Sequence, residues 1–260
     1  MDAIIWFVAT LVLLVIVVQW LHRHILGFFF LLSGNEDVAL ILYFFPLSPG
    51  VLLHELSHTV AAFILRVRAG GFTVFPRRDP TGRITLGSVM VEQVDPIRAS
   101  LIGVAPLVFG CGAVLLIGYH VFGLSDMESV LLAGDFQAIV ATAGRILQTP
   151  DAWLWLYLMF AISTTMLPSA SDRETWPPVI LFIAGVVALV VLSNQTAILE
   201  AFAGSLGVAI NWLTAAFVIT LAINLPVAAL LVLLEWGTAS IIGRRVYYSR
   251  PGDDKPKKRR

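Results

Sequence analysis

Charged residues are scarce in this chain of 260 residues. Asp, Glu, Lys and Arg together make up 13% of it, whereas a soluble protein carries about 25%. Hydrophobic residues make up 58% of the chain, and the mean hydropathy is +0.87. This composition excludes an ordinary soluble domain and favours a polytopic membrane protein. We therefore expect the lipid bilayer as a partner and no nucleic acid.

The chain also has little cysteine, and its first apolar stretch does not have the features of a secretory signal peptide. Its single cysteine, Cys111, lies in an apolar run, so a disulfide framework within one chain is excluded and a buried apolar role is expected. The apolar stretch at residues 1–20 is longer than a signal-peptide core and lacks a basic start and a cleavage site. We interpret it as a retained transmembrane helix.

Six apolar segments are candidates for spanning helices, which need about 20 mostly apolar residues. They are residues 3–21, 38–65, 98–122, 151–168, 177–194 and 208–241. In the second segment, PLSPG at 46–50 is expected to kink or break the helix. The sequence therefore predicts an all-α polytopic membrane protein with about six transmembrane helices, in a single membrane domain over residues 1–260.

One loop, at residues 69–96, has a different composition. Its sequences FTVF and RITLGSVMVEQ are rich in β-branched and aromatic residues. DPTG, at 79–82 between them, has proline second and glycine fourth, as a type I turn prefers. We predict a small β-hairpin here.

Basic residues are distributed unevenly between the two sides of a six-span protein. Fifteen of the 17 Lys and Arg residues would lie on one side, which also holds the hairpin, both termini and the basic tail at 246–260. Arg23 and Arg145 would lie on the other. Because basic loops face the cytoplasm, we predict a multi-pass protein of the cell membrane with both termini and the hairpin in the cytoplasm.

Residues 50–65, GVLLHELSHTVAAFIL, are apolar enough for a membrane but contain ionisable groups. Such groups are costly in hydrocarbon unless they are paired or bind a ligand. His54, Glu55 and His58 form an HExxH sequence, and residues four apart share one face of a helix, so both imidazoles can bind one metal ion. Zinc lowers the pKa of bound water to about 7, and Glu55 can take the proton. Amide hydrolysis is the obvious use; hydrogen bonding of the three residues inside a bundle is the alternative.

Two further sequences give the chain a resemblance to the site-2 protease family of intramembrane zinc metalloproteases. STTMLPSASDRETW, at 163–176, includes Pro168 and Asp172, which match a proline and an aspartate of that family. GVAPLVFG, at 103–110, is similar to the Gly-Pro-containing helix of the family. The likeness covers residues 38–175, which we take as the core of the domain.

The resemblance implies a zinc endopeptidase that cuts transmembrane proteins in or near their membrane-spanning segments. It implies zinc bound by His54, His58 and Asp172, with Glu55 as general base and later proton donor. Thr164 stands about where the family has asparagine, and the loop at 69–96 is too short for an inserted PDZ domain.

Several alternatives remain open from the sequence. Glu235, in the last apolar segment, is a rival third ligand, and Arg173 could instead hold Asp172 in a surface ion pair. His22 and His24 flank the first segment and are expected to reach toward the membrane surface. At the level of function, the alternatives are an inactive scaffold that binds membrane helices and a transporter whose HELSH sequence binds the transported ion.

Overall fold

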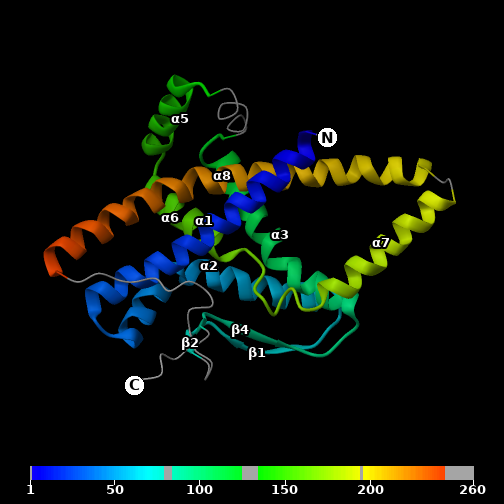
Figure 1. The fold of residues 1–260 in the computed structure, drawn as a ribbon, viewed down its shortest axis with the longest axis horizontal. Helices are drawn as coiled ribbons and strands as arrows, with labels where there is room; N and C mark the ends of the chain where they lie inside the picture. The colour runs from blue at the N-terminus through cyan, green and yellow to red at the C-terminus, as the bar shows by residue number, and fades with distance from the viewer. Residues whose placement is uncertain (1, 79–83, 125–133, 194–195, 244–260) are drawn as a thin grey trace, which may run out of the picture.

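The computed structural model describes residues 2–78, 84–124, 134–193 and 196–243, which form seven helices and four short strands. The helices are α1 (Asp2–Ser33), α2 (Glu36–Ile64), α3 (Pro96–His120), α5 (Phe136–Gln148), α6 (Ala152–Thr165), α7 (Trp176–Leu192) and α8 (Thr196–Ile242). The strands are β1 (Ala69–Thr73), β2 (Arg77–Arg78), β3 (Ile84–Thr85) and β4 (Ser88–Val91). Figure 1 shows the helices crossing one another, with the strands along one edge of the molecule.

The chain is a helical membrane protein. Among the described residues, four helices are long and apolar enough to cross a membrane: Ala3–Ser33, Glu36–Ile64, Pro96–His120 and Ala203–Ile242. Two of the six predicted spans form shorter apolar helices, α6 with 14 residues and α7 with 17. Six spans therefore remain a prediction.

The first two helices differ from the sequence prediction. α1 continues to Ser33 instead of ending near residue 21. α2 runs through Pro46 and Pro49 as one continuous helix, so of the predicted kink or break at 46–50 the break is wrong. Pro49 has no N–H to donate to the carbonyl of Phe45, four residues earlier. The Ser48 hydroxyl donates to that carbonyl instead, at 2.8 Å, as side chains do in membrane helices that contain proline.

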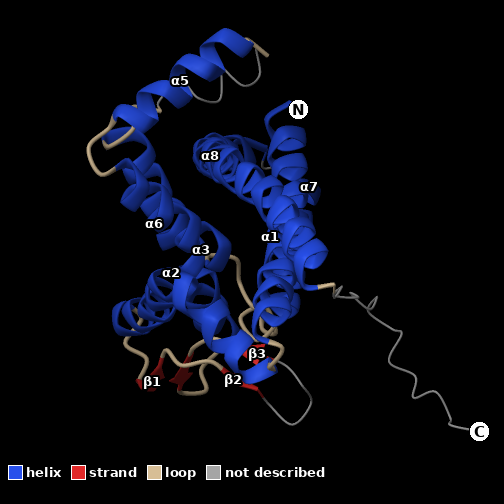
Figure 2. Ribbon diagram, turned by 90° about the vertical axis from the view of Figure 1, so that its left-hand side faces the viewer, coloured by secondary structure: helices blue, strands red, loops and turns tan. Residues whose placement is uncertain are grey.

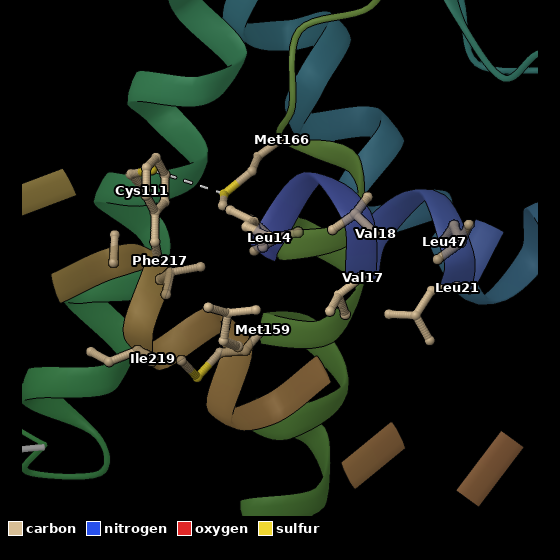
Figure 3. Close-up of a cluster of buried hydrophobic side chains, with 14 of the residues drawn as sticks. Leu14, Val17, Val18, Leu21, Leu47, Cys111, Met159, Met166, Phe217 and Ile219 are labelled. Atoms are coloured by element: carbon tan, nitrogen blue, oxygen red, sulfur yellow. Dashed lines mark hydrogen bonds between the residues drawn. The ribbon is translucent and has the colours of Figure 1, made fainter. Parts of the chain in front are cut away.

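One large hydrophobic core joins α1, α2, α3, α6 and α8. Figure 3 shows its centre, where Leu14 of α1 lies near Met159 of α6 and Phe217 of α8, while Leu21 of α1 lies near Leu47 of α2. Cys111 is 3% exposed, as its apolar surroundings predict, and its Sγ lies 4.0 Å from Sδ of Met166. The core thus fixes the C-terminal end of α6 against α1 and α3.

The strands form the predicted hairpin in two short antiparallel pairs, β1 with β4 and β2 with β3. Gly70 pairs with Met90 and Thr73 with Ser88, and the register is irregular between these two pairs. The predicted turn at 79–82 and the basic tail at 246–260 lie outside the described residues. Figures 1 and 2 place the strands at the opposite end of the molecule from α5.

Candidate metal centre

Three segments that are distant in the sequence meet at the HELSH residues of α2. α6 packs on α2 and ends at Thr165, and the chain then leads to Asp172 before α7 begins. On the other side lies α3, where Gly103 contacts the backbone of Asp172 so closely that a Cβ atom at Gly103 would overlap the Asp172 carbonyl oxygen. Glycine at this position therefore allows the Asp172 loop to lie directly against α3.

His54, His58 and Asp172 point their side chains at one another. Their possible ligand atoms all lie within 4.8 Å of each other. The two Nε2 atoms are 3.2 Å apart; Oδ2 of Asp172 lies 3.6 Å from Nε2 of His54, and Oδ1 lies 3.3 Å from Nε2 of His58. Ligands bound tetrahedrally at 2.0–2.1 Å lie about 3.3 Å apart, so the three side chains are close enough to share one metal ion.

The hydrogen bonds of the two imidazole rings also suit a cation. Nδ1 of His54 lies 2.7 Å from the Thr165 carbonyl, and Nδ1 of His58 lies 2.9 Å from the Ile102 carbonyl. A carbonyl oxygen only accepts, so each Nδ1 carries the hydrogen and, in a neutral ring, Nε2 carries a lone pair. Two such lone pairs at 3.2 Å cannot hydrogen-bond to each other. A cation between them satisfies both, and the carbonyls are the outer partners that orient metal-binding histidines.

Asp172 is held in place by its own loop. Its Oδ2 accepts a hydrogen bond from the Ser169 backbone N–H at 2.7 Å, and its N–H donates to Ser169 Oγ at 3.3 Å. Burial raises the pKa of the Asp172 carboxyl. When the imidazole rings are protonated and bind no metal, a hydrogen bond from His54, the Ser169 groups and the charge of His58 outweigh burial and lower the pKa to about 2. Asp172 is therefore a carboxylate at neutral pH, which makes it a suitable anionic ligand.

Glu55 lies beside this cluster and under the hairpin. It is 7% exposed and is close enough to His54 and Asp172 for their charges to act on it. On its other side is Gly87, between β3 and β4; a Cβ atom there would lie 2.8 Å from Oε1 of Glu55. The neighbouring Leu86 packs on the main hydrophobic core. The carboxylate thus lies in a nearly closed space between the three possible ligands and the hairpin.

The rival residues occupy other places. Glu235 of α8 lies 2.8 Å from Nδ1 of His24 on α1, and it is not part of the three-residue cluster. Arg173 donates from Nε to the Ser169 carbonyl at 3.1 Å. Among the described residues, His54, His58 and Asp172 are the group of three or more His, Cys, Asp or Glu side chains that could hold a metal ion.

The sequence did not reveal the partners that orient the ligands. The carbonyls of Thr165 and Ile102 have no sequence signature, because every residue has a carbonyl. The expectation that His22 reaches the membrane surface is wrong: its ring lies inside the bundle, against Tyr43 and the Thr164 carbonyl. A signal did exist, since a histidine in a long apolar helix is costly unless it has partners.

Comparison with known proteins gives no match for this chain, whether with family models, with curated proteins or with solved structures. What the site can do must therefore be argued from its own geometry. That geometry shows two imidazoles and a carboxylate arranged to hold a metal ion, with a second carboxylate beside them.

Proposed function

We propose that the chain is an intramembrane zinc metalloprotease, similar to the site-2 protease family. It would hydrolyse peptide bonds in or near transmembrane segments of other membrane proteins. The observation that carries the proposal is the convergence of His54, His58 and Asp172, whose possible ligand atoms lie within 4.8 Å of one another, beside Glu55. Both histidines and Glu55 belong to α2, a helix apolar enough to cross a membrane. Two imidazoles and a carboxylate are a usual ligand set for catalytic zinc.

The residues of the site have distinct roles in this proposal. His54, His58 and Asp172 bind the zinc ion, which when bound supplies a Lewis acid for the substrate carbonyl and for water. Glu55 takes a proton from the attacking water and later gives it to the leaving amine, as a general base and then a general acid. The enclosure of Glu55, which is 7% exposed, limits the access of other water molecules.

We further propose six spans, with both termini in the cytoplasm and the site opening toward it. Fifteen of the 17 Lys and Arg residues lie on the side assigned to the cytoplasm, as the positive-inside rule requires. α6 and α7 are apolar enough to span if the membrane is locally thin or the helices extend by a few residues.

The test compares wild type with Glu55→Gln, which keeps the shape of the side chain but removes the base. Glu36→Gln, at the other end of α2, is the matched control. Each protein is purified in detergent for metal analysis, and each is expressed in native membranes, where new peptide termini within transmembrane segments are identified by mass spectrometry. We expect all three to bind zinc, with cleavage by Glu55→Gln lowered about 10²–10⁴-fold.

Each alternative predicts a different result. Equal cleavage by Glu55→Gln and wild type would show that Glu55 is not the base. Bound metal without any cleavage by the wild type would favour the helix-binding scaffold. Zinc uptake into vesicles that depends on His54 and His58 would favour the transporter.

A further inference from the structure

His22 of α1 connects three helices next to the metal centre. Its Nδ1 lies 2.6 Å from the hydroxyl of Tyr43 on α2, and its Nε2 lies 2.9 Å from the carbonyl of Thr164 on α6. Both partners are buried, Tyr43 at 6% and Thr164 at 1% exposed. A polar link of this kind is strong inside a bundle, because no water competes for its atoms.

The two contacts fix the tautomer of His22. The Thr164 carbonyl can only accept, so His22 donates from Nε2. In a neutral ring Nδ1 is then an acceptor, and it receives the hydroxyl hydrogen of Tyr43. This tautomer is the opposite of the one assigned to His54 and His58, whose Nε2 atoms face the metal centre. His22 therefore bonds to the protein through both nitrogens and has no free ligand atom.

The bond to Thr164 replaces one that the helix cannot make. The last carbonyls of an α-helix have no partner within it, and the N–H that would reach Thr164 belongs to residue 168, which is a proline. His22 supplies the missing donor. The next carbonyl along, that of Thr165, accepts from Nδ1 of His54 at 2.7 Å. Two histidines from different helices thus hold adjacent carbonyls at the end of α6.

We infer that His22 is a positioning residue of the metal centre. By holding the end of α6, it fixes the Thr165 carbonyl that orients the His54 ring, and it fixes the start of the loop that carries Asp172. Tyr43 supports it by donating its hydroxyl hydrogen to Nδ1 of His22. The inference rests on the metal centre of the proposed function, but not on proteolysis.

The experiment measures metal affinity in three variants purified in detergent. His22→Leu removes both hydrogen bonds, whereas His22→Gln keeps an amide that can donate to Thr164 and accept from Tyr43. His24→Leu is the matched control, because it removes a bond between α1 and α8 two residues away from His22. Zinc affinity is measured by competition with a chromophoric chelator, and the visible absorption of bound Co²⁺ reports the ligand geometry.

We expect His22→Leu to bind zinc more weakly, by up to the roughly 10- to 100-fold that follows the loss of a direct outer partner of a metal ligand, and to have an altered Co²⁺ spectrum. His22→Gln should recover most of the affinity, and His24→Leu should match the wild type. Should His22→Leu not fold, Tyr43→Phe tests the same link by removing one hydroxyl, with a smaller loss expected.

Two results overturn the inference while leaving the proposed function intact. One is wild-type affinity and spectrum in His22→Leu, or in Tyr43→Phe where that variant replaces it. The other is an equal loss in His24→Leu, which would show only a general loosening of α1. A wild-type protein that binds no metal would instead refute the metal centre itself, and the inference with it.

Discussion

Replacement of Gly87 by alanine should displace the Glu55 carboxylate. A Cβ atom at Gly87 would lie 2.7 Å from Cγ, 2.8 Å from Oε1 and 3.0 Å from Cδ of Glu55. Ordinary contacts of a Cβ atom begin at 3.4 Å, so one of the two groups must move by about 0.7 Å. Gly87 is not among the glycines with positive φ. Alanine therefore causes no backbone strain there, and its only effect is the steric contact of the added methyl group with Glu55.

The expected effect follows from this displacement. A misplacement of about 1 Å in a catalytic group costs about 10²-fold in rate, so we expect a loss of about 10- to 100-fold in kcat. Zinc content should not change, because the three atoms nearest to the added Cβ all belong to Glu55. Gly70→Ala is the matched control: Gly70 lies in the same hairpin, and a Cβ atom there would meet nothing within 4 Å.

The assay is the rate of cleavage of a substrate captured by Glu55→Gln in native membranes, with metal analysis of each variant. Equal turnover by Gly87→Ala and Gly70→Ala would show that the hairpin moves away freely, and it would refute the close packing of the hairpin on Glu55. Loss of zinc in Gly87→Ala would show that the methyl group disturbs the ligands instead of the base.

Three further predictions concern the third ligand, the topology and the hairpin. Asp172→Ala should lower the zinc content from about one ion per chain to near zero, whereas Glu235→Ala should retain zinc; metal loss only in the Glu235 variant would reverse the assignment. Met90→Cys, in a Cys111→Ala background, should react with an impermeant maleimide only from the cytoplasmic face, and labelling from outside would mean that the topology is wrong. Phe72→Pro, in the irregular part of β1, should reduce cleavage but not zinc content if the strand edge pairs with the unwound substrate; unchanged turnover would favour a hairpin that only covers the site.

The sequence predicts best what depends on neighbouring residues. Hydropathy locates the apolar helices, because each must satisfy its own backbone hydrogen bonds in the membrane. The HELSH sequence places His54 and His58 on one face of α2 through helix geometry alone. Boundaries were less accurate: α1 continues past the charged and polar residues at 22–24, because Arg23 is exposed while His22 and His24 have partners inside the bundle.

The presence of a proline does not by itself predict whether a helix ends, because another group can bond to the carbonyl that the proline leaves free. Pro49 frees the carbonyl of Phe45, and the Ser48 hydroxyl of the same turn takes it, so α2 continues. Pro168 frees the carbonyl of Thr164, and a ring from another helix takes it, at the place where α6 ends and the chain turns toward Asp172. Both prolines predict a break by the same rule. The first donor is local and could be found from the sequence; the second is 142 residues away and becomes visible only when the helices are packed.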